Sequence, residues 1–215
     1  MKRFQAVLFD LDGTLIDSRL DLANAVNHAL GTVGLPQQTE AGITVHVGNG
    51  LRVLLSEVMG PVAESVLERG IGAFSSFYDQ HCTDRTILYP GVDEVLRSLA
   101  GLLKFAVVTN KPERFAIKIV EKLGLGDLMP VIVGGDTLPE KKPHPAPVLK
   151  ALTDLKCEPD EALMVGDGFQ DILAAQTAGV RSCAAEYGYG FRIETLDLKP
   201  DFKIRRFTEL KEIVT

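Results

Sequence analysis

The fold is decided by residues 4–14, which read FQAVLFDLDGT. The apolar run predicts a short buried strand over Phe4–Phe9, and a polar turn begins directly after it at Asp10. Later runs rich in Val, Ile, Leu and Phe predict further strands, and uninterrupted apolar runs are typical of parallel strands covered on both faces. We expect these strands at Phe105–Thr109, Val131–Val133, Ala162–Val165, Arg181–Ala185 and, from a weaker signal, Phe202–Ile204.

Helical patterns separate the later strands. Gly124 and Gly179 directly follow two of these patterns, as expected of glycines that end helices. Strands that alternate with helices predict the α/β class, with a doubly wound parallel sheet as a Rossmann-like core. The helices are expected at Val92–Leu102, Glu113–Leu123, Ala146–Leu155 and Phe169–Ala178.

The stretch between about residues 18 and 84 has helical periodicity and no convincing strand. Apolar residues recur at three- and four-residue steps from Leu22 to Val33, and Asp17 or Ser18 can cap the start of this helix. The pattern continues over Val53–Met59 and Ile71–Tyr78.

This helical block predicts a second domain inserted after the first strand. We expect an α/β core made of residues 1–16 and 85–215, and a helical domain made of residues 17–84.

Composition excludes several classes of protein. The 215 residues are 46% hydrophobic and 24% charged, which is an ordinary globular balance. The net charge of −6 offers no general basic field for nucleic acid, so no nucleic-acid partner is expected.

The cysteines and apolar runs predict the compartment. The chain has three cysteines and no CxxC pair, which argues against a disulfide framework. The first apolar run stops at Asp10, too early for a secretory signal, and no run is long enough to span a membrane. We therefore expect a soluble, cytoplasmic protein without membrane contact.

Polar side chains follow the predicted strands at their carboxyl ends, where parallel sheets bind ligands. Taken singly, each of these residues is explained as well by a turn, a helix cap or a solvated loop. Their joint placement at one edge of one sheet predicts a shared site instead. These residues are Asp10, Asp12, Thr109, Asn110, Lys142, Asp167 and Asp171.

The residue types at this edge indicate a chemistry. Several carboxylates at one place repel each other unless a cation lies among them. Oxygen ligands without His or Cys favour Mg2+, which commonly binds one or two carboxylates together with a substrate phosphate. The hydroxyl of Thr109 and the ammonium of Lys142 suit a phosphoryl group.

The four segments resemble the motifs of the haloacid dehalogenase superfamily of phosphohydrolases. They are DLDGT at 10–14, the apolar run that ends at Thr109, KPHP at 142–145 and GDGFQD at 166–171. Flanking segments such as TNKP at 109–112 and YGYG at 187–190 resemble bacterial phosphoglycolate phosphatases more closely. One departure is Gly168, where family members often carry Ser or Thr.

The resemblance implies roles for these residues. Asp10 would be the nucleophile that forms an aspartyl-phosphate, and Asp12 would be the general acid and then the general base. Thr109 and Lys142 would bind the phosphoryl group. Because Lys141 precedes Lys142, the family's lysine is open to misassignment by one position, and the K-P spacing favours Lys142. Metal binding would involve Asp10, the backbone carbonyl of Asp12, Asp167 and Asp171.

The helical domain resembles the family's cap, which closes over the site and selects the substrate. Asn110, together with Asn49 and Arg52 near a predicted helix start, would contact the substrate, although a glycine turn followed by a solvated arginine is the simpler explanation for the last two. The expected partner is a small phosphorylated metabolite, with 2-phosphoglycolate favoured. We expect a monomer or a homodimer.

Alternative functions remain open at this stage. A sugar phosphomutase, or a broad small-molecule phosphatase or pyrophosphatase, would use the same motifs. A phospho-accepting receiver domain also combines Asp, Thr and Lys on a doubly wound sheet. Its phosphorylated Asp follows a middle strand, however, whereas the DxD pair here follows the first.

Overall fold

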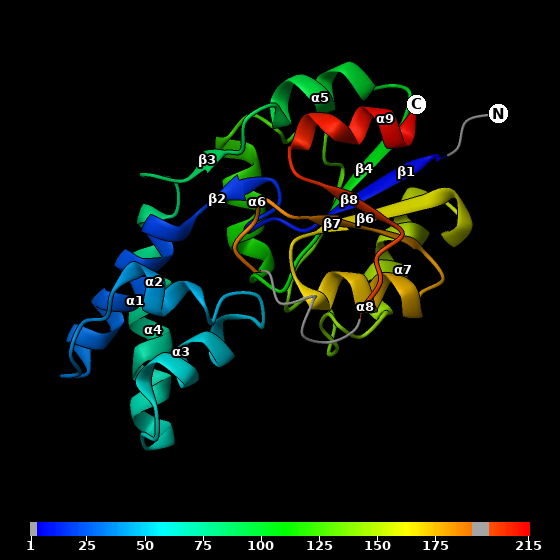
Figure 1. The fold of residues 1–215 in the computed structure, drawn as a ribbon. Coiled ribbons are helices and arrows are strands. Elements are labelled where there is room, and N and C mark those ends of the chain that lie inside the picture. Colours follow the sequence, from blue (N-terminus) through cyan, green and yellow to red (C-terminus); the bar gives the residue numbers. More distant parts are fainter. Residues whose placement is uncertain (1–3, 191–197) are drawn as a thin grey trace.

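Six strands form one parallel sheet in the computed structural model, which describes residues 4–190 and 198–215 (Figure 1). All six lie where the sequence predicts strands, within one or two residues at each end. The predicted α/β class and doubly wound sheet are therefore confirmed. The strands are β1 (Ala6–Phe9), β4 (Lys104–Val108), β5 (Val131–Val133), β6 (Ala162–Gly166), β7 (Arg181–Ala185) and β8 (Phe202–Ile204).

The strand order is β5-β4-β1-β6-β7-β8, which places β1 in the interior of the sheet. The chain first adds β4 and β5 on one side of β1 and then adds β6, β7 and β8 on the other. In such a sheet, ligands bind where the direction of strand addition reverses. The carboxyl end of β1, at Asp10, lies at this point.

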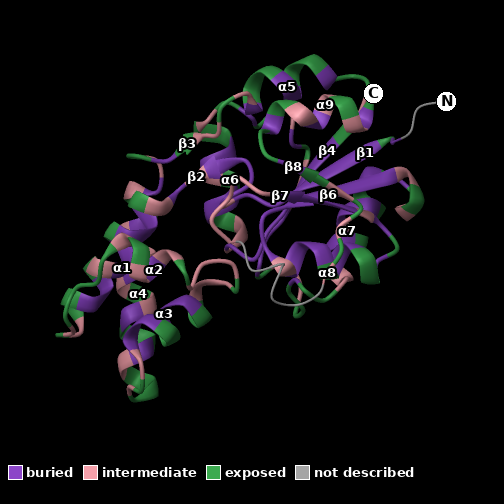
Figure 2. Cartoon of the chain, viewed as in Figure 1, coloured by how far each residue is buried: buried purple, intermediate pink, exposed green. Residues whose placement is uncertain are grey.

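Helices cover both faces of the sheet because alternate strand residues point to opposite sides. In β1, Val7 and Phe9 belong to one hydrophobic cluster, whereas Ala6 and Leu8 belong to another. Purple strands between two helical layers in Figure 2 show that the sheet is buried on both faces. One layer holds α5 (Val92–Leu99), α6 (Glu113–Lys122) and α9 (Leu210–Val214), and the other holds α7 (Ala146–Leu155) and α8 (Phe169–Thr177).

The core helices agree with the sequence patterns except at their ends. The helix predicted over Val92–Leu102 ends at Leu99, because Ala100 takes an extended ψ of 137° and Gly101 has a φ of +77°. Gly124 and Gly179 lie just beyond α6 and α8 with a φ of +74° at each, as expected for glycines that end helices.

A block of four helices lies beside the sheet, on the side of its carboxyl ends (Figure 1). Its long helices, α1 and α4, pack along each other, and α3 packs against α4. The sequence predicts three of these helices and misses the shortest. The helices are α1 (Arg19–Thr32), α2 (Glu40–Thr44), α3 (Leu51–Met59) and α4 (Glu64–His81).

Two short strands that the sequence analysis missed join the block to the sheet. β2 (Ile16–Asp17) pairs antiparallel with β3 (Ile87–Leu88). Next to them, the buried carboxylate of Asp21 accepts hydrogen bonds from the backbone N–H groups of Arg85 and Thr86 and from the Thr86 hydroxyl. The chain thus enters and leaves the helical block through one two-stranded ribbon, which hydrogen bonds to Asp21 hold together.

The division into a core (1–16, 85–215) and a helical domain (17–84) stays a prediction, and its segments 1–3 and 191–197 lie outside the described residues. In the described part of the chain, no helix is both long enough and apolar enough to cross a membrane.

Candidate active site

Three carboxylates meet at the carboxyl edge of the sheet. Asp10 follows β1, Asp167 follows β6, and Asp171 lies in the first turn of α8. One oxygen from each lies within 4.8 Å of the others, and all three residues are buried. The structure therefore brings together three acidic side chains that the sequence places after two different strands.

Lys142 is the cation that faces this cluster. Its Nζ lies 2.9 Å from Asp10 Oδ1 and 2.6 Å from Asp171 Oδ1, and it also donates to the carbonyl of Val108. Burial alone would lower the pKa of Lys142, but the two carboxylates outweigh it and the pKa is raised, so the lysine is charged. Lys141 is exposed, which supports the K-P spacing as the guide to the buried lysine.

One lysine does not balance the three carboxylates. Burial, followed by the charges of Asp10 and Asp171, raises the pKa of Asp167 well above its usual range. Burial likewise raises the pKa of Asp171, to about 6, although Lys142 opposes the shift. Such shifts measure the cost of holding the charged forms together, a cost that a bound cation removes.

The cluster fits a hard divalent cation. Asp10 Oδ1 is buried and, apart from its ion pair with Lys142, has no hydrogen-bond partner among the described residues. The donor set consists of carboxylate oxygens only, which suits Mg2+ better than a transition metal. Asp10, Asp167 and Asp171 would hold the ion.

Backbone groups fix the carboxylate of Asp167. The N–H groups of Tyr189 and Gly190 donate to its Oδ2, at 3.0 and 2.6 Å. Gly13 approaches from the other side, where a Cβ would lie 1.9 Å from the same oxygen. With a φ of +83°, this position requires glycine for its backbone conformation as well as for space. The glycine of the DLDGT motif therefore allows the two strand ends to meet.

Asp171 is fixed by the turn that carries it. The N–H of Gly168 donates to its Oδ2 at 3.0 Å, while Lys142 binds the other oxygen. The residue after Asp167, where the resemblance expects a hydroxyl, thus contributes a backbone donor. A Cβ at this position would lie 2.3 Å from the amide oxygen of Gln170, which is the end of a flexible side chain.

Asp12 lies outside the carboxylate cluster and has partners of its own. Lys111 Nζ donates to both of its oxygens, at 2.9 and 2.7 Å, and Ser18 Oγ donates to Oδ1 at 2.5 Å. Ser18 also contacts the hydroxyl of Tyr189 at 2.9 Å. Asp17 or Ser18 was expected to cap α1, but the Ser18 side chain makes no capping bond and donates to Asp12 instead.

Lys111 and Ser18 contact Asp12, and Tyr189 contacts Ser18, but the sequence did not predict that any of the three belongs to the site. Lys111 and Tyr189 fall inside the TNKP and YGYG segments, so a signal was present in the resemblance. Nothing in the residue pattern indicated which side chain of each segment points to Asp12. That information required the tertiary structure.

Thr109 and Asn110 follow β4 and are both buried. The Thr109 hydroxyl accepts the N–H of Lys111 at 3.3 Å, and among the described residues nothing accepts its own proton. The Asn110 amide instead donates to the carbonyls of Gly48 and Lys142, each at 2.8 Å. The Thr109 hydroxyl is thus available to donate to a ligand. The Asn110 amide instead connects the loop at Gly48, in the helical block, to the loop that carries Lys142.

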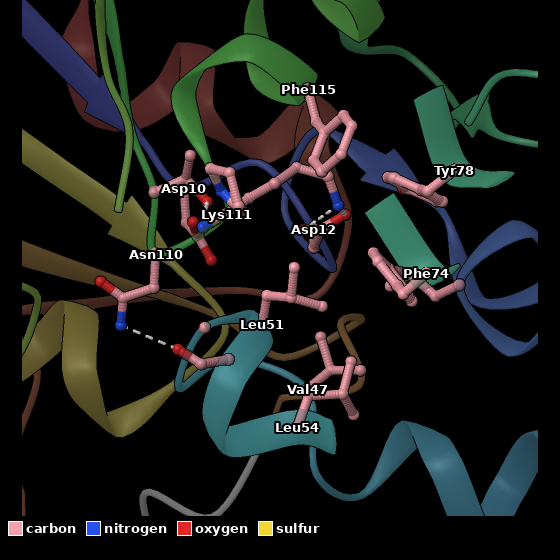
Figure 3. Close-up of a pocket in the computed structure, with 15 residues that line it drawn as sticks. Asp10, Asp12, Val47, Leu51, Leu54, Phe74, Tyr78, Asn110, Lys111 and Phe115 are labelled. Carbon is pink, nitrogen blue, oxygen red and sulfur yellow. Dashed lines mark hydrogen bonds and ion pairs between the residues drawn. The ribbon is translucent and has the colours of Figure 1, made fainter. Parts of the chain in front are cut away.

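A cavity extends from Asp10 and Asp12 towards the helical block (Figure 3). It encloses about 480 Å³, including space open to solvent. Thr109 and Lys111 line it on the sheet side. Most of its remaining wall is apolar and comes from Leu22, Val47, Leu51, Leu54, Phe74, Tyr78, Pro112 and Phe115.

The other two residues expected to contact the substrate lie elsewhere. Asn49 Oδ1 accepts a hydrogen bond from Gln170 Nε2 at 2.8 Å and bridges the helical block to α8. Arg52 pairs with Glu64 and Glu68 on the exposed side of the block and does not line the cavity. The structure therefore does not bring Arg52 to Asp10.

Comparison with known proteins identifies the family. The model of the haloacid dehalogenase-like hydrolases matches residues 7–185. The chain belongs to this family. Its enzymes include phosphatases, and a phosphoglycolate phosphatase of Chromobacterium violaceum is 40% identical over 220 aligned residues, covering 100% of this chain and 98% of the relative. A phosphoglycolate phosphatase of Aquifex aeolicus is 38% identical, covering 98% and 96% of the two chains.

Solved structures of the family have the same fold. A "predicted phosphoglycolate phosphatase" from Haemophilus somnus superimposes with a TM-score of 0.93 at 34% identity, and each chain is covered completely. The haloacid dehalogenase-like chain described here is therefore a phosphatase by family and by relatives, and the receiver-domain alternative is wrong.

Proposed function

We propose that this phosphatase is a Mg2+-dependent phosphomonoesterase that converts 2-phosphoglycolate to glycolate and phosphate. One observation carries the proposal: Asp10 belongs to the carboxylate cluster, which fits a cation, and also lines the cavity. A phosphoryl group in the cavity would meet a carboxylate nucleophile and a site for a cation at the same place. The names of the relatives support 2-phosphoglycolate as the substrate.

The reaction would proceed in two displacements. Asp10 attacks phosphorus, the ester P–O bond breaks, and an aspartyl-phosphate forms while Asp12 gives a proton to the leaving alkoxide. Asp12 then takes a proton from water, which attacks phosphorus and frees Asp10. Asp12 suits both steps because it lines the same cavity as Asp10.

The remaining residues would bind and orient the phosphoryl group. The free hydroxyl proton of Thr109 would donate to a phosphoryl oxygen, and Lys142, already 2.9 Å from Asp10, would offset developing negative charge. When bound by the carboxylate cluster, Mg2+ would supply further charge neutralisation.

The first experiment is phosphate release from 2-phosphoglycolate, hexose phosphates, nucleoside monophosphates and pyrophosphate, with and without Mg2+. We expect 2-phosphoglycolate to be preferred by tenfold or more, about 1.4 kcal/mol, and only with Mg2+. The Asp10→Asn variant should release no phosphate. Equal rates on all esters would contradict the named substrate, and full activity of Asp10→Asn would contradict the mechanism.

A further inference from the structure

The apolar wall of the cavity raises a question about the leaving group. Glycolate carries a carboxylate one carbon away from the oxygen that leaves phosphorus. A carboxylate placed among side chains such as Leu51, Leu54 and Phe74 is costly unless it is paired and hydrogen-bonded. A phosphatase for this ester therefore needs a cation and a donor in the cavity wall.

Lys111 is the only cationic side chain among the described residues that line the cavity. It is buried, so its charge acts in a poorly solvated place. In Figure 3 it lies between Asp12 and the aromatic side chains of the wall. Within the described residues, its ammonium donates hydrogen bonds only to the oxygens of Asp12, although an ammonium has three N–H donors.

Tyr78, from α4, supplies a second and independent observation. Its ring contacts the Lys111 ammonium, with 4.9 Å between Nζ and the ring centroid, and it lines the same cavity. The residue is fully buried, yet its hydroxyl has no hydrogen-bond partner in the described part of the chain. A buried hydroxyl without a partner is uncommon and points to a ligand that is bound during function.

The hydroxyl can act as a donor. Burial, followed by the charge of Asp12, raises the pKa of Tyr78 well above its usual range, so the proton is retained. A carboxylate would accept one hydrogen bond from this hydroxyl and another from an N–H of Lys111.

We infer that Lys111 and the Tyr78 hydroxyl form the binding site for the substrate carboxylate, an inference that rests on the proposed function. The site lies against Asp12, and a carboxylate next to a second carboxylate would be repelled without the ammonium between them. Lys111 would thus have two partners: it would hold Asp12 in place and bind the carboxylate end of the substrate. Selectivity for a carboxylated ester would originate here.

The test compares 2-phosphoglycolate with 2-phosphoglycolamide, which has the same skeleton and phosphate but a neutral amide in place of the carboxylate. The ratio of their kcat/KM values isolates recognition of the carboxylate. We expect wild type to prefer the acid by about thirtyfold, and Lys111→Met to reduce this preference to about threefold or less. Lys111→Arg should restore part of it. Lys141→Met, which removes an exposed lysine outside the cavity, should keep the wild-type ratio.

A Tyr78→Phe variant tests the site without the risk that a loss of activity is caused by misfolding. Removal of a buried hydroxyl without a partner should leave the melting temperature equal or higher, while KM for 2-phosphoglycolate rises by about tenfold. A loss of activity with unchanged stability would support the site. A KM equal to that of wild type would overturn the role of Tyr78.

Other outcomes separate the inference from the proposed function. If Lys111→Met lowers kcat/KM equally for both esters, the lysine acts only through Asp12 and the inference is wrong. It is equally wrong if the preference is lost in Arg52→Met instead. Calorimetric binding of both esters to Asp10→Asn provides a readout without turnover. If wild type hydrolyses neither ester but binding of the acid still requires Lys111, the proposed reaction fails and the carboxylate site stands.

Discussion

Asp10 lies between two regions that are built from different parts of the fold. The polar side is the cluster of charged, buried groups at strand ends, in which Asp10, Asp167 and Asp171 face Lys142. Of these four residues, only Asp10 lines the cavity. The opposite wall consists largely of apolar side chains from the helical block, such as Leu54 and Phe74.

The difference separates the chemistry from the choice of substrate. Charged groups that must hold their geometry lie on the rigid edge of a sheet, where each is fixed by backbone donors or ion pairs. The helical wall supplies shape, and Lys111 is the only cationic side chain among the described residues that line the cavity. Substitutions on the two sides should therefore differ in their effects on stability, on phosphate release and on the response to Mg2+.

The largest effect is expected on the polar side from Lys142→Met. This variant leaves buried carboxylates without their cation and should lower the free energy of unfolding by about 3–5 kcal/mol. Phosphate release should fall by at least about 100-fold. Urea unfolding and a phosphate assay measure both effects.

Asp10→Asn is the matched control for Lys142→Met. It should be equally inactive, but it removes one of the repelling charges and should unfold at higher urea than wild type. If both variants change the free energy of unfolding in the same direction, charge repulsion among the carboxylates does not determine the stability of this cluster.

The next effect is expected on the apolar side from Leu54→Ala. Leu54 is buried in α3, and its truncation should lower the free energy of unfolding by about 2–5 kcal/mol. The rise in melting temperature caused by Mg2+ should equal that of wild type, because no carboxylate is altered. Differential scanning calorimetry with and without Mg2+ tests this. A lost Mg2+ response would show that the two sides are coupled.

A smaller effect concerns pH and Mg2+. The pKa of Asp171 is raised from 3.8 to about 6, so between these values the folded protein binds more protons than the unfolded chain. The stability of the metal-free protein should then fall as pH rises through this window. Stabilisation by Mg2+ should be larger at pH 7.5 than at pH 5, and about 2.7 kcal/mol at 100 times its Kd.

Thermal unfolding at both pH values, with EDTA or Mg2+ at matched ionic strength, checks this prediction. Asp171→Asn should reduce the pH dependence and leave the part that comes from the raised pKa of Asp167. An equal response to Mg2+ at pH 5 and pH 7.5 would place the cation away from these carboxylates.

The smallest effect is expected from Arg52→Gln. The guanidinium pairs with Glu64 and Glu68 at the surface, and such pairs contribute about 1 kcal/mol or less. Because Arg52 does not line the cavity, kcat/KM for 2-phosphoglycolate should change by less than about threefold. A larger loss in steady-state assays would show that the resemblance placed Arg52 correctly and that the helical block moves when substrate binds.

Much of the core could be predicted because its signals are local. Each buried strand is an apolar run, so β5, β7 and β8 lie at the predicted residues, and β1, β4 and β6 differ only at their ends. The ribbon of β2 and β3 could not be found this way, because two residues per strand form no pattern and their pairing depends on contacts between distant segments.

The same distinction holds within the site. The positions of Asp10, Asp167 and Lys142 follow from a general property of parallel sheets, whose strand ends meet at one edge. The partners of Asp12 do not, because Lys111 and Ser18 come from turns whose side-chain directions are set by packing. Arg52 illustrates the converse, since its sequence position near a helix start says nothing about which way it points.

The sequence by itself determined the fold class, the edge of the sheet that carries the chemistry and the family of the enzyme, because strand periodicity and short motifs are properties of neighbouring residues. Only the tertiary structure decided which groups surround Asp12 and which line the cavity. It placed the ring of Tyr78 against the ammonium of Lys111, from two segments 33 positions apart in the sequence. Such juxtapositions depend on how helices pack against a sheet, and no local pattern records them.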